Sequence, residues 1–83
     1  MKIEQIKKFL LQKYLDKTPV TVNLKTRKPF TGVFIKTADF EELKAKNFWR
    51  IVGEANIENY KKSRDMNLVR IFSGMEITKL SVS

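Results

Sequence analysis

The chain contains neither cysteine nor histidine, and these two absences narrow its possible chemistry. Without cysteine, neither a disulfide nor a thiolate metal site can hold the fold together, which fits a reducing compartment. Without cysteine and histidine, neither a thiol nucleophile nor an imidazole base is available. Asp39, Glu41 and Glu42 are neighbouring acids without the spacing of metal ligands. We therefore expect a protein that is not an enzyme and that holds no metal and no cofactor.

The sequence also lacks a long apolar run. A helix that crosses a bilayer needs about 20 consecutive apolar residues, and no segment approaches that length. Residues 1–5 carry one lysine and an early acid, in contrast to the apolar core of a signal peptide. We therefore expect a soluble protein of the cytoplasm that has no membrane partner.

Acidic side chains are few relative to basic ones. The 83 residues include 17 lysines and arginines against 9 acids, which gives a net charge of +8. A small domain this basic is a candidate for binding a polyanion, most often a nucleic acid. A lysine-rich surface that only keeps the protein soluble explains the charge equally well.

The length suits a single domain over 1–83 with a modest core, which small barrels often supplement by pairing with copies of themselves.

A helix is predicted over about residues 2–15. Apolar side chains recur there at three- and four-residue spacings, so they line one face of the helix. They are Ile3, Ile6, Phe9, Leu10 and Tyr14. Pro19 disfavours a helical conformation at Thr18, so the helix ends before that residue.

Most of the remaining chain is predicted to form strands, which makes the fold mainly β with one N-terminal α-helix. Residues 20–24 alternate between apolar and polar side chains, as in a half-buried strand. Gly32 lies within the next strand, over 30–36, and allows the sharp bend by which a small barrel closes. The other predicted segments are strands over 43–52, 68–72 and 77–82, a tight connection over 39–42 and a long polar loop over about 53–66.

Several of these segments, taken in order, resemble the Sm-like superfamily and most closely its bacterial Hfq branch. The segments are Phe9-Leu10, Pro19-Val20-Thr21-Val22-Asn23-Leu24, Phe30-Thr31-Gly32 and Phe72-Ser73-Gly74-Met75-Glu76-Ile77. The resemblance implies a five-stranded, strongly bent antiparallel small barrel over about 20–82, capped by the N-terminal helix. It also implies a homo-oligomeric ring, usually a hexamer or heptamer, in which the fourth strand of one subunit pairs with the fifth strand of the next. Such pairing removes the exposed edges of both strands.

The resemblance also implies which residues would meet RNA. In Sm-like rings an aromatic or apolar side chain stacks on a base, an asparagine contacts the base edge, and a basic side chain packs against the base. Phe40 matches the stacking position. The remaining pocket positions depart from the family. Glu42 (or Glu41) stands where the family has the asparagine, Ser73 stands where it has the basic residue, and Met75 stands where a second asparagine follows that basic residue. The Lys-His pair of the Hfq branch has no counterpart, because the chain contains no histidine.

A second group of candidate RNA-binding residues lies in the turn after the first strand. Lys25, Arg27 and Lys28 cluster there, and a ring would repeat them into a positive annulus on the face opposite the helix. Such a surface binds phosphates with a strong salt dependence. A merely solvated turn explains the cluster equally well. With Phe40 stacking on a base, we expect a ring that binds single-stranded RNA. The resemblance to the Hfq branch implies that such a ring acts as an RNA chaperone in post-transcriptional regulation.

Two other functions remain open. An Sm-fold adaptor that has lost base recognition would bind a protein partner, which would agree with Glu42 and Ser73 in the pocket. Trp49 would then be a candidate for an exposed aromatic anchor. A monomeric Sm-like or SH3-like barrel would instead serve as a small module inside a larger complex.

Overall fold

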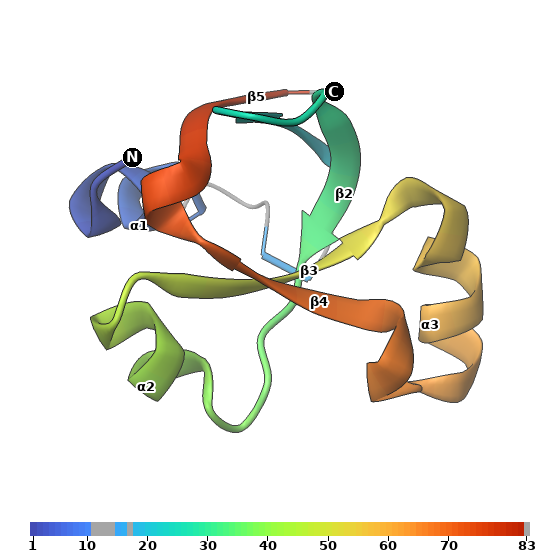
Figure 1. The fold of residues 1–83 in the computed structure, drawn as a ribbon. Helices are drawn as coiled ribbons and strands as arrows, with labels where there is room; N and C mark the ends of the chain where they lie inside the picture. Colours follow the sequence, from blue (N-terminus) through green and yellow to red (C-terminus); the bar gives the residue numbers. More distant parts are fainter. Residues whose placement is uncertain (11–14, 17, 83) are drawn as a thin grey trace.

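The computed structural model describes residues 1–10, 15–16 and 18–82. Among them, five antiparallel strands form a single sheet in the order β4-β3-β2-β1-β5, preceded by the N-terminal helix α1 (Figure 1). The strands are β1 (Val20–Leu24), β2 (Phe30–Phe34), β3 (Phe48–Gly53), β4 (Val69–Ser73) and β5 (Ile77–Val82). The prediction of a helix followed by a five-stranded antiparallel sheet is therefore confirmed, although the fold contains more helix than predicted.

Helix α1 (Ile3–Leu10) covers part of the inner face of the sheet. Ile6 and Leu10 are buried there against strand residues, as the spacing of apolar side chains predicts. The helix was predicted to continue to about residue 15, but residues 11–14, which include Tyr14, lie outside the described residues. No helix in the described part of the chain is long and apolar enough to cross a membrane.

The inner face of the curved sheet carries the main core. Strand β1 alternates as predicted, with Val20, Val22 and Leu24 buried. The strand register places Phe34 opposite Ile51, so the two side chains point to the same face. The buried members of this core are Ile6, Leu10, Val20, Val22, Leu24, Phe34, Trp49, Ile51, Ile77 and Leu80.

Trp49 is part of this inner core and is only 1% exposed. The suggestion that Trp49 is an exposed anchor is therefore wrong, because alternation along β3 directs its side chain inward. The neighbouring ring of Phe48 points to the outer face instead and is 38% exposed. Alternation along a strand directs two neighbouring side chains to opposite faces, and the strand register decides that Phe48 is the one facing outward.

Residues 43–47, predicted as the beginning of the third strand, belong to helix α2 (Phe40–Ala45) and to the turn after it. The predicted tight connection over 39–42 is the start of the same helix. Acids in its first turn and a lysine in its last turn favour the helix through its dipole. Asn47 then adopts a positive φ of 61°, which ends the turn and directs the chain into β3.

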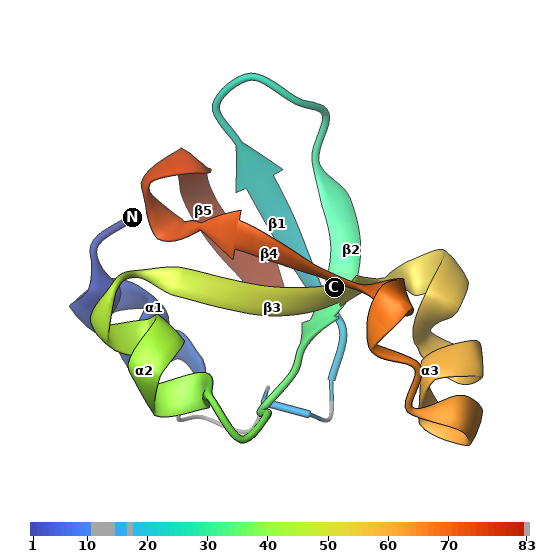
Figure 2. The same cartoon turned by 60° about the horizontal axis from the view of Figure 1, so that its bottom comes forward.

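The segment 53–66, predicted as a long polar loop, is mostly helical. It contains a short 3-10 turn at Glu54–Asn56 and the helix α3 (Ile57–Ser63). Ile57 and Tyr60 lie three residues apart and pack against Val33, Ile35, Val52 and Val69 on the outer face of the sheet. Two apolar residues in a polar segment are a weak periodic signal, and only the sheet beneath them stabilises the helix. In Figure 2, α3 lies at one end of β3 and α2 lies at the other.

Asn47 connects three parts of the chain through hydrogen bonds. Its Oδ1 accepts a bond of 2.8 Å from Trp49 Nε1, and its Nδ2 donates to the Met1 carbonyl at 3.2 Å. Its own carbonyl accepts a bond of 2.7 Å from the amide of Gly74. Gly74 begins the 3-10 turn Gly74–Glu76 between β4 and β5, and an added Cβ there would lie only 2.0 Å from Asn47 Oδ1. The glycine is therefore required by this close approach.

Candidate nucleic-acid interface

A cavity opens on the inner side of the sheet between the β1–β2 turn and β4. We call it the mouth cavity; its lining includes Arg27, Lys28, Phe30, Asn56, Arg70 and Phe72. The register of β3 and β4 explains why β4 contributes to it. Phe72 lies opposite Trp49 and Arg70 lies opposite Ile51, so both side chains share the inner face with the core.

Two aromatic rings form part of the wall of the mouth cavity. Phe30 and Phe72 are stacked, with ring centroids 5.1 Å apart and an angle of 27° between their planes. Both side chains are half-buried, so they are fixed in place and remain partly accessible. An accessible aromatic ring is a surface on which a nucleobase can stack, an interaction worth about 1–3 kcal/mol per base.

Positive charge surrounds the two rings. Arg27 and Lys28, in the β1–β2 turn, and Arg70, on β4, line the cavity, and all three are exposed. No acidic residue lines the mouth cavity within the described part of the chain. An adjoining depression shares Arg27, Arg70 and Phe72 and adds one acid, Glu76. The rim therefore carries a clear excess of positive charge.

The mouth cavity has a volume of about 270 Å³, which gives room for one planar group over the rings. Arginine and lysine can bind phosphates on either side of such a group. Asn56 also lines the cavity, and its side-chain amide can both donate and accept hydrogen bonds at a base edge. The arrangement suits a single-stranded nucleic acid better than a duplex, because stacking requires an unpaired base.

The structure places the three basic residues of the predicted turn cluster in two different surroundings. Arg27 and Lys28 line the mouth cavity, whereas Lys25 is not part of its described lining. Lys25 is exposed, and its backbone amide donates a 3.0 Å hydrogen bond to the Glu76 carbonyl. The Met1 amino group donates to the carbonyls of Gly74 and Ile77, on either side of Glu76, so Lys25 lies on the side of the N-terminus. Burial and the charge of Lys25 both lower the pKa of this amino group.

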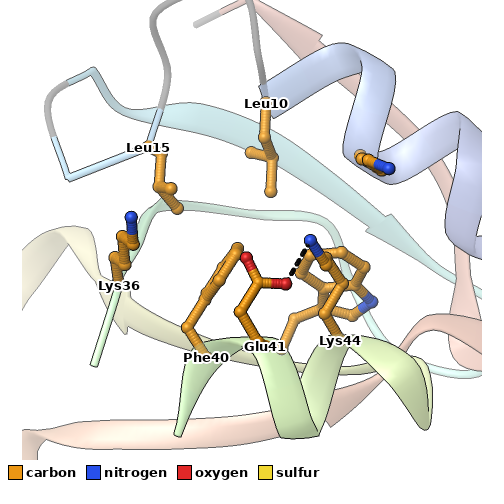
Figure 3. Close-up of a pocket in the computed structure, with 8 residues that line it drawn as sticks. Leu10, Leu15, Lys36, Phe40, Glu41 and Lys44 are labelled. Atoms are coloured by element: carbon orange, nitrogen blue, oxygen red, sulfur yellow. Dashed lines mark ion pairs between the residues drawn. The ribbon is translucent and has the colours of Figure 1, made fainter. Parts of the chain in front are cut away.

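Phe40 lies in a different part of the molecule. It begins α2 and packs edge-to-face on Trp49, with ring centroids 6.0 Å apart. Its ring lines a second cavity, between α1 and α2 (Figure 3). Figure 2 shows α2 and the β1–β2 turn at opposite ends of the molecule. The structure therefore does not bring Phe40 together with Arg27 and Lys28.

An ion pair anchors the beginning of α2 to β3. Arg50 Nη2 donates to Asp39 Oδ2 at 2.8 Å, and the hydroxyl of Thr37 donates to the other oxygen of this carboxylate. These hydrogen bonds, with that of Arg50 the strongest, lower the pKa of Asp39 to about 2. The carboxylate therefore stays ionised, and the start of the helix is held beside Trp49.

The three positions that depart from the family pattern have ordinary structural surroundings. Glu42 is exposed on α2. Ser73 Oγ accepts a 3.2 Å hydrogen bond from the amide of Met75 and so caps the turn between β4 and β5. Met75 is 64% exposed. Ser73 lines the depression next to the mouth cavity, whereas Glu42 lines neither of these two surfaces.

Phe30, Asn56, Arg70 and Phe72 were not predicted as site residues. Arg70 and Phe72 alternate on one strand, so the sequence does place them on a common face. It does not indicate that this face meets the β1–β2 turn, which is more than 40 residues away along the chain. No family model, curated protein or solved structure matches this chain, so its function is inferred from these residues.

Proposed function

We propose that this protein binds single-stranded RNA at the mouth cavity. The observation that carries the proposal is the combination of two stacked rings, Phe30 and Phe72, with exposed cations around one cavity. Aromatic rings accept bases of any sequence, and cations bind the phosphates between them. Arg27 and Lys28 keep the role predicted from the sequence, while base stacking moves from Phe40 to the rings of the mouth cavity.

The wider proposal is that the chain is an Sm-like protein close to the Hfq branch. It would act as an RNA chaperone in post-transcriptional regulation in the cytoplasm, without catalysis. The N-terminal helix, the five antiparallel strands and the short turn between β4 and β5 support this proposal, since the resemblance implies each of them.

Labelled single-stranded RNA should bind the protein with an affinity that falls as salt is added. Three phosphate contacts per chain correspond to a slope of about −2 in log K against log[salt]. Stacking on Phe30 and Phe72 does not depend on salt in this way, so binding should persist at physiological ionic strength. Fluorescence anisotropy with uridine-rich and adenine-rich RNA, from low to physiological salt, measures both properties. Binding that vanishes at physiological salt would reduce the interaction to nonspecific attraction by the net charge and would contradict the proposal.

A homo-oligomeric ring is the second part of the proposal. Strands β4 and β5 end the sheet, so each has one edge without a partner among the described strands. Exposed apolar side chains accompany these edges, with Ile71 50% and Val82 63% exposed. Pairing β4 of one copy with β5 of the next would cover the apolar side chains and satisfy the free backbone groups.

Light scattering on the purified protein should therefore give the mass of a ring. Six or seven copies of the 9.8 kDa chain have a mass of about 59 or 69 kDa. An Ile71→Lys variant should shift this mass toward the monomer, because a charge at the edge opposes pairing. A wild-type mass of one chain at the concentrations used for RNA titration would contradict the ring and favour a monomeric module.

An adaptor that binds a protein partner is the alternative function. Phe48, Ile71 and Met75 are exposed apolar residues on or next to β3 and β4, and they support a protein-binding surface. Trp49 no longer supports it, because Trp49 is buried. A monomer that binds RNA only at low salt would favour the adaptor over the RNA-binding ring.

A further inference from the structure

The second cavity, between α1 and α2, has a lining suited to a small ligand (Figure 3). Its apolar walls are formed by Leu10, Leu15, Phe40 and Trp49. Phe40 and Trp49 meet edge-to-face, with ring centroids 6.0 Å apart, and both residues line the cavity. In Figure 3, Phe40 extends from α2 toward the leucines on the other side.

Among the residues that the structure describes, three lysines and one acid lie around these apolar walls. They are Lys7 from α1, Lys36 from the segment after β2, and Lys44 with Glu41 from α2. The side chain of Lys44 is only 20% exposed, whereas that of Glu41 is 73% exposed. Its amino group lies 2.5 Å from Glu41 Oε2 and 5.5 Å from the centre of the Phe40 ring.

Glu41 marks the position at which this cavity favours an anion. The pKa of Glu41 is lowered, first by the hydrogen bond from Lys44 and then by the charges of Lys44, Lys36 and Lys7, against an opposing effect of burial. All three lysines therefore act on one carboxylate. The Glu41 side chain is 73% exposed, so it can move into solvent and leave its place to another anion. Without it, the charged side chains of the described lining are the three lysines.

The size of the cavity limits the apolar part of a ligand. Its volume is about 140 Å³, close to that of an engineered apolar cavity of about 150 Å³ that holds one benzene molecule. One six-membered ring fits between Phe40 and the leucines. An anionic group directly on that ring would then lie beside Lys44.

We propose that the cavity between α1 and α2 binds a single-ring aromatic carboxylate. The ring packs against Phe40, Leu10 and Leu15, and the carboxylate replaces that of Glu41 at Lys44. Lys7 and Lys36 supply further positive charge at the rim. This site is separate from the mouth cavity, and the proposal does not depend on RNA binding.

Benzoate titration tests the proposal directly, because Trp49 lines the cavity and is the one tryptophan of the sequence. Benzoate should change the tryptophan fluorescence with a Kd of about 1 mM, reasonable for a ligand of this size. Benzyl alcohol, which keeps the ring without the charge, and acetate, which keeps the charge without the ring, should each bind at least tenfold more weakly. Equal binding of either one would overturn the proposal.

Variants of the charged pair give opposite expectations. Lys44→Gln should weaken benzoate binding about tenfold, because the carboxylate loses its nearest cation. Glu41→Gln should strengthen binding about threefold, because it removes the internal competitor. Glu58→Gln, which removes one acid from the first turn of α3 outside the cavity lining, is the matched control and should leave the affinity unchanged. Circular dichroism verifies that each variant is folded.

Two results would refute the assignment. Wild-type affinity in Lys44→Gln would mean that the lysine does not bind the ligand. Tighter binding of uridine 5′-monophosphate than of benzoate would assign the cavity to nucleotides instead of aromatic carboxylates. A tenfold loss in Lys44→Gln together with a gain in Glu41→Gln would establish the site.

Discussion

Replacing Gly74 with alanine should lower the free energy of unfolding by about 3 kcal/mol. The new Cβ would lie 2.0 Å from Asn47 Oδ1 and 2.5 Å from Asn47 Cγ, so the asparagine side chain would have to move. Overpacking of this kind costs about 1–3 kcal/mol. Movement of Asn47 also removes the acceptor of buried Trp49 Nε1, and an unpaired buried donor costs about 1–3 kcal/mol.

Chemical denaturation of a double-mutant cycle with Asn47→Gly separates these costs. Glycine at position 47 tolerates the positive φ of 61° and removes the side chain that clashes. Gly74→Ala should then cost less than about 1 kcal/mol in the Asn47→Gly background, a coupling of about 2 kcal/mol. Similar costs in both backgrounds would show that the clash with Asn47 is not the cause.

Gly53→Ala is the matched control for this measurement. An added Cβ at Gly53 would have no atom within 4 Å. The backbone there is extended, with φ −66° and ψ 153°, so alanine fits without strain. The control should be neutral or stabilising by about 0.4–1 kcal/mol, since alanine reduces the entropy of the unfolded chain.

The double variant Arg27→Gln/Lys28→Gln should bind single-stranded RNA about 25-fold more weakly at 0.1 M salt. Each phosphate contact contributes about 0.7 to the slope of log K against log[salt], so two lost contacts should reduce the slope by about 1.4. At 1 M salt these electrostatic contacts no longer contribute, so the variant and the wild type should bind equally there. Over the tenfold decrease to 0.1 M salt, a slope difference of about 1.4 gives a difference in affinity of about 25-fold. Anisotropy titrations over this range of salt measure both numbers.

Lys61→Gln/Lys62→Gln provides the control for net charge. Both lysines are exposed at the end of α3, and neither lines the mouth cavity. This variant loses the same two charges, so a purely nonspecific attraction to the basic protein would weaken equally in both variants. An equal loss of RNA affinity in the two variants would contradict RNA binding at the mouth cavity. A loss of affinity confined to the Arg27→Gln/Lys28→Gln variant would locate the interface there.

Much of the sheet could be predicted from the sequence, because local patterns encode it. The strict alternation of Val20, Val22 and Leu24 specifies which face of β1 is buried. The predicted range of β5 matches its bounds, Ile77–Val82. The sequence also places Arg27 and Lys28 in an exposed turn, since charged residues next to a proline cannot continue a buried strand.

Helices α2 and α3 could not be predicted in the same way. Each is short, and an isolated helix of this length is unstable in water. α2 is stabilised by Phe40 on Trp49 and by the ion pair of Asp39 with Arg50, and α3 by Tyr60 on the outer face. These contacts join residues that become neighbours only when the sheet has formed.

By itself, the sequence determined the order of the strands along the chain, the N-terminal helix and the excess of positive charge. Only the tertiary structure decided which side chains come together in the two proposed binding sites. It joined Phe30 to Phe72 across the mouth cavity, separated Phe40 from Arg27, and buried Trp49 while it left Phe48 exposed. The physical reason is that alternation specifies the two faces of each strand, whereas strand pairing and sheet curvature specify which faces meet.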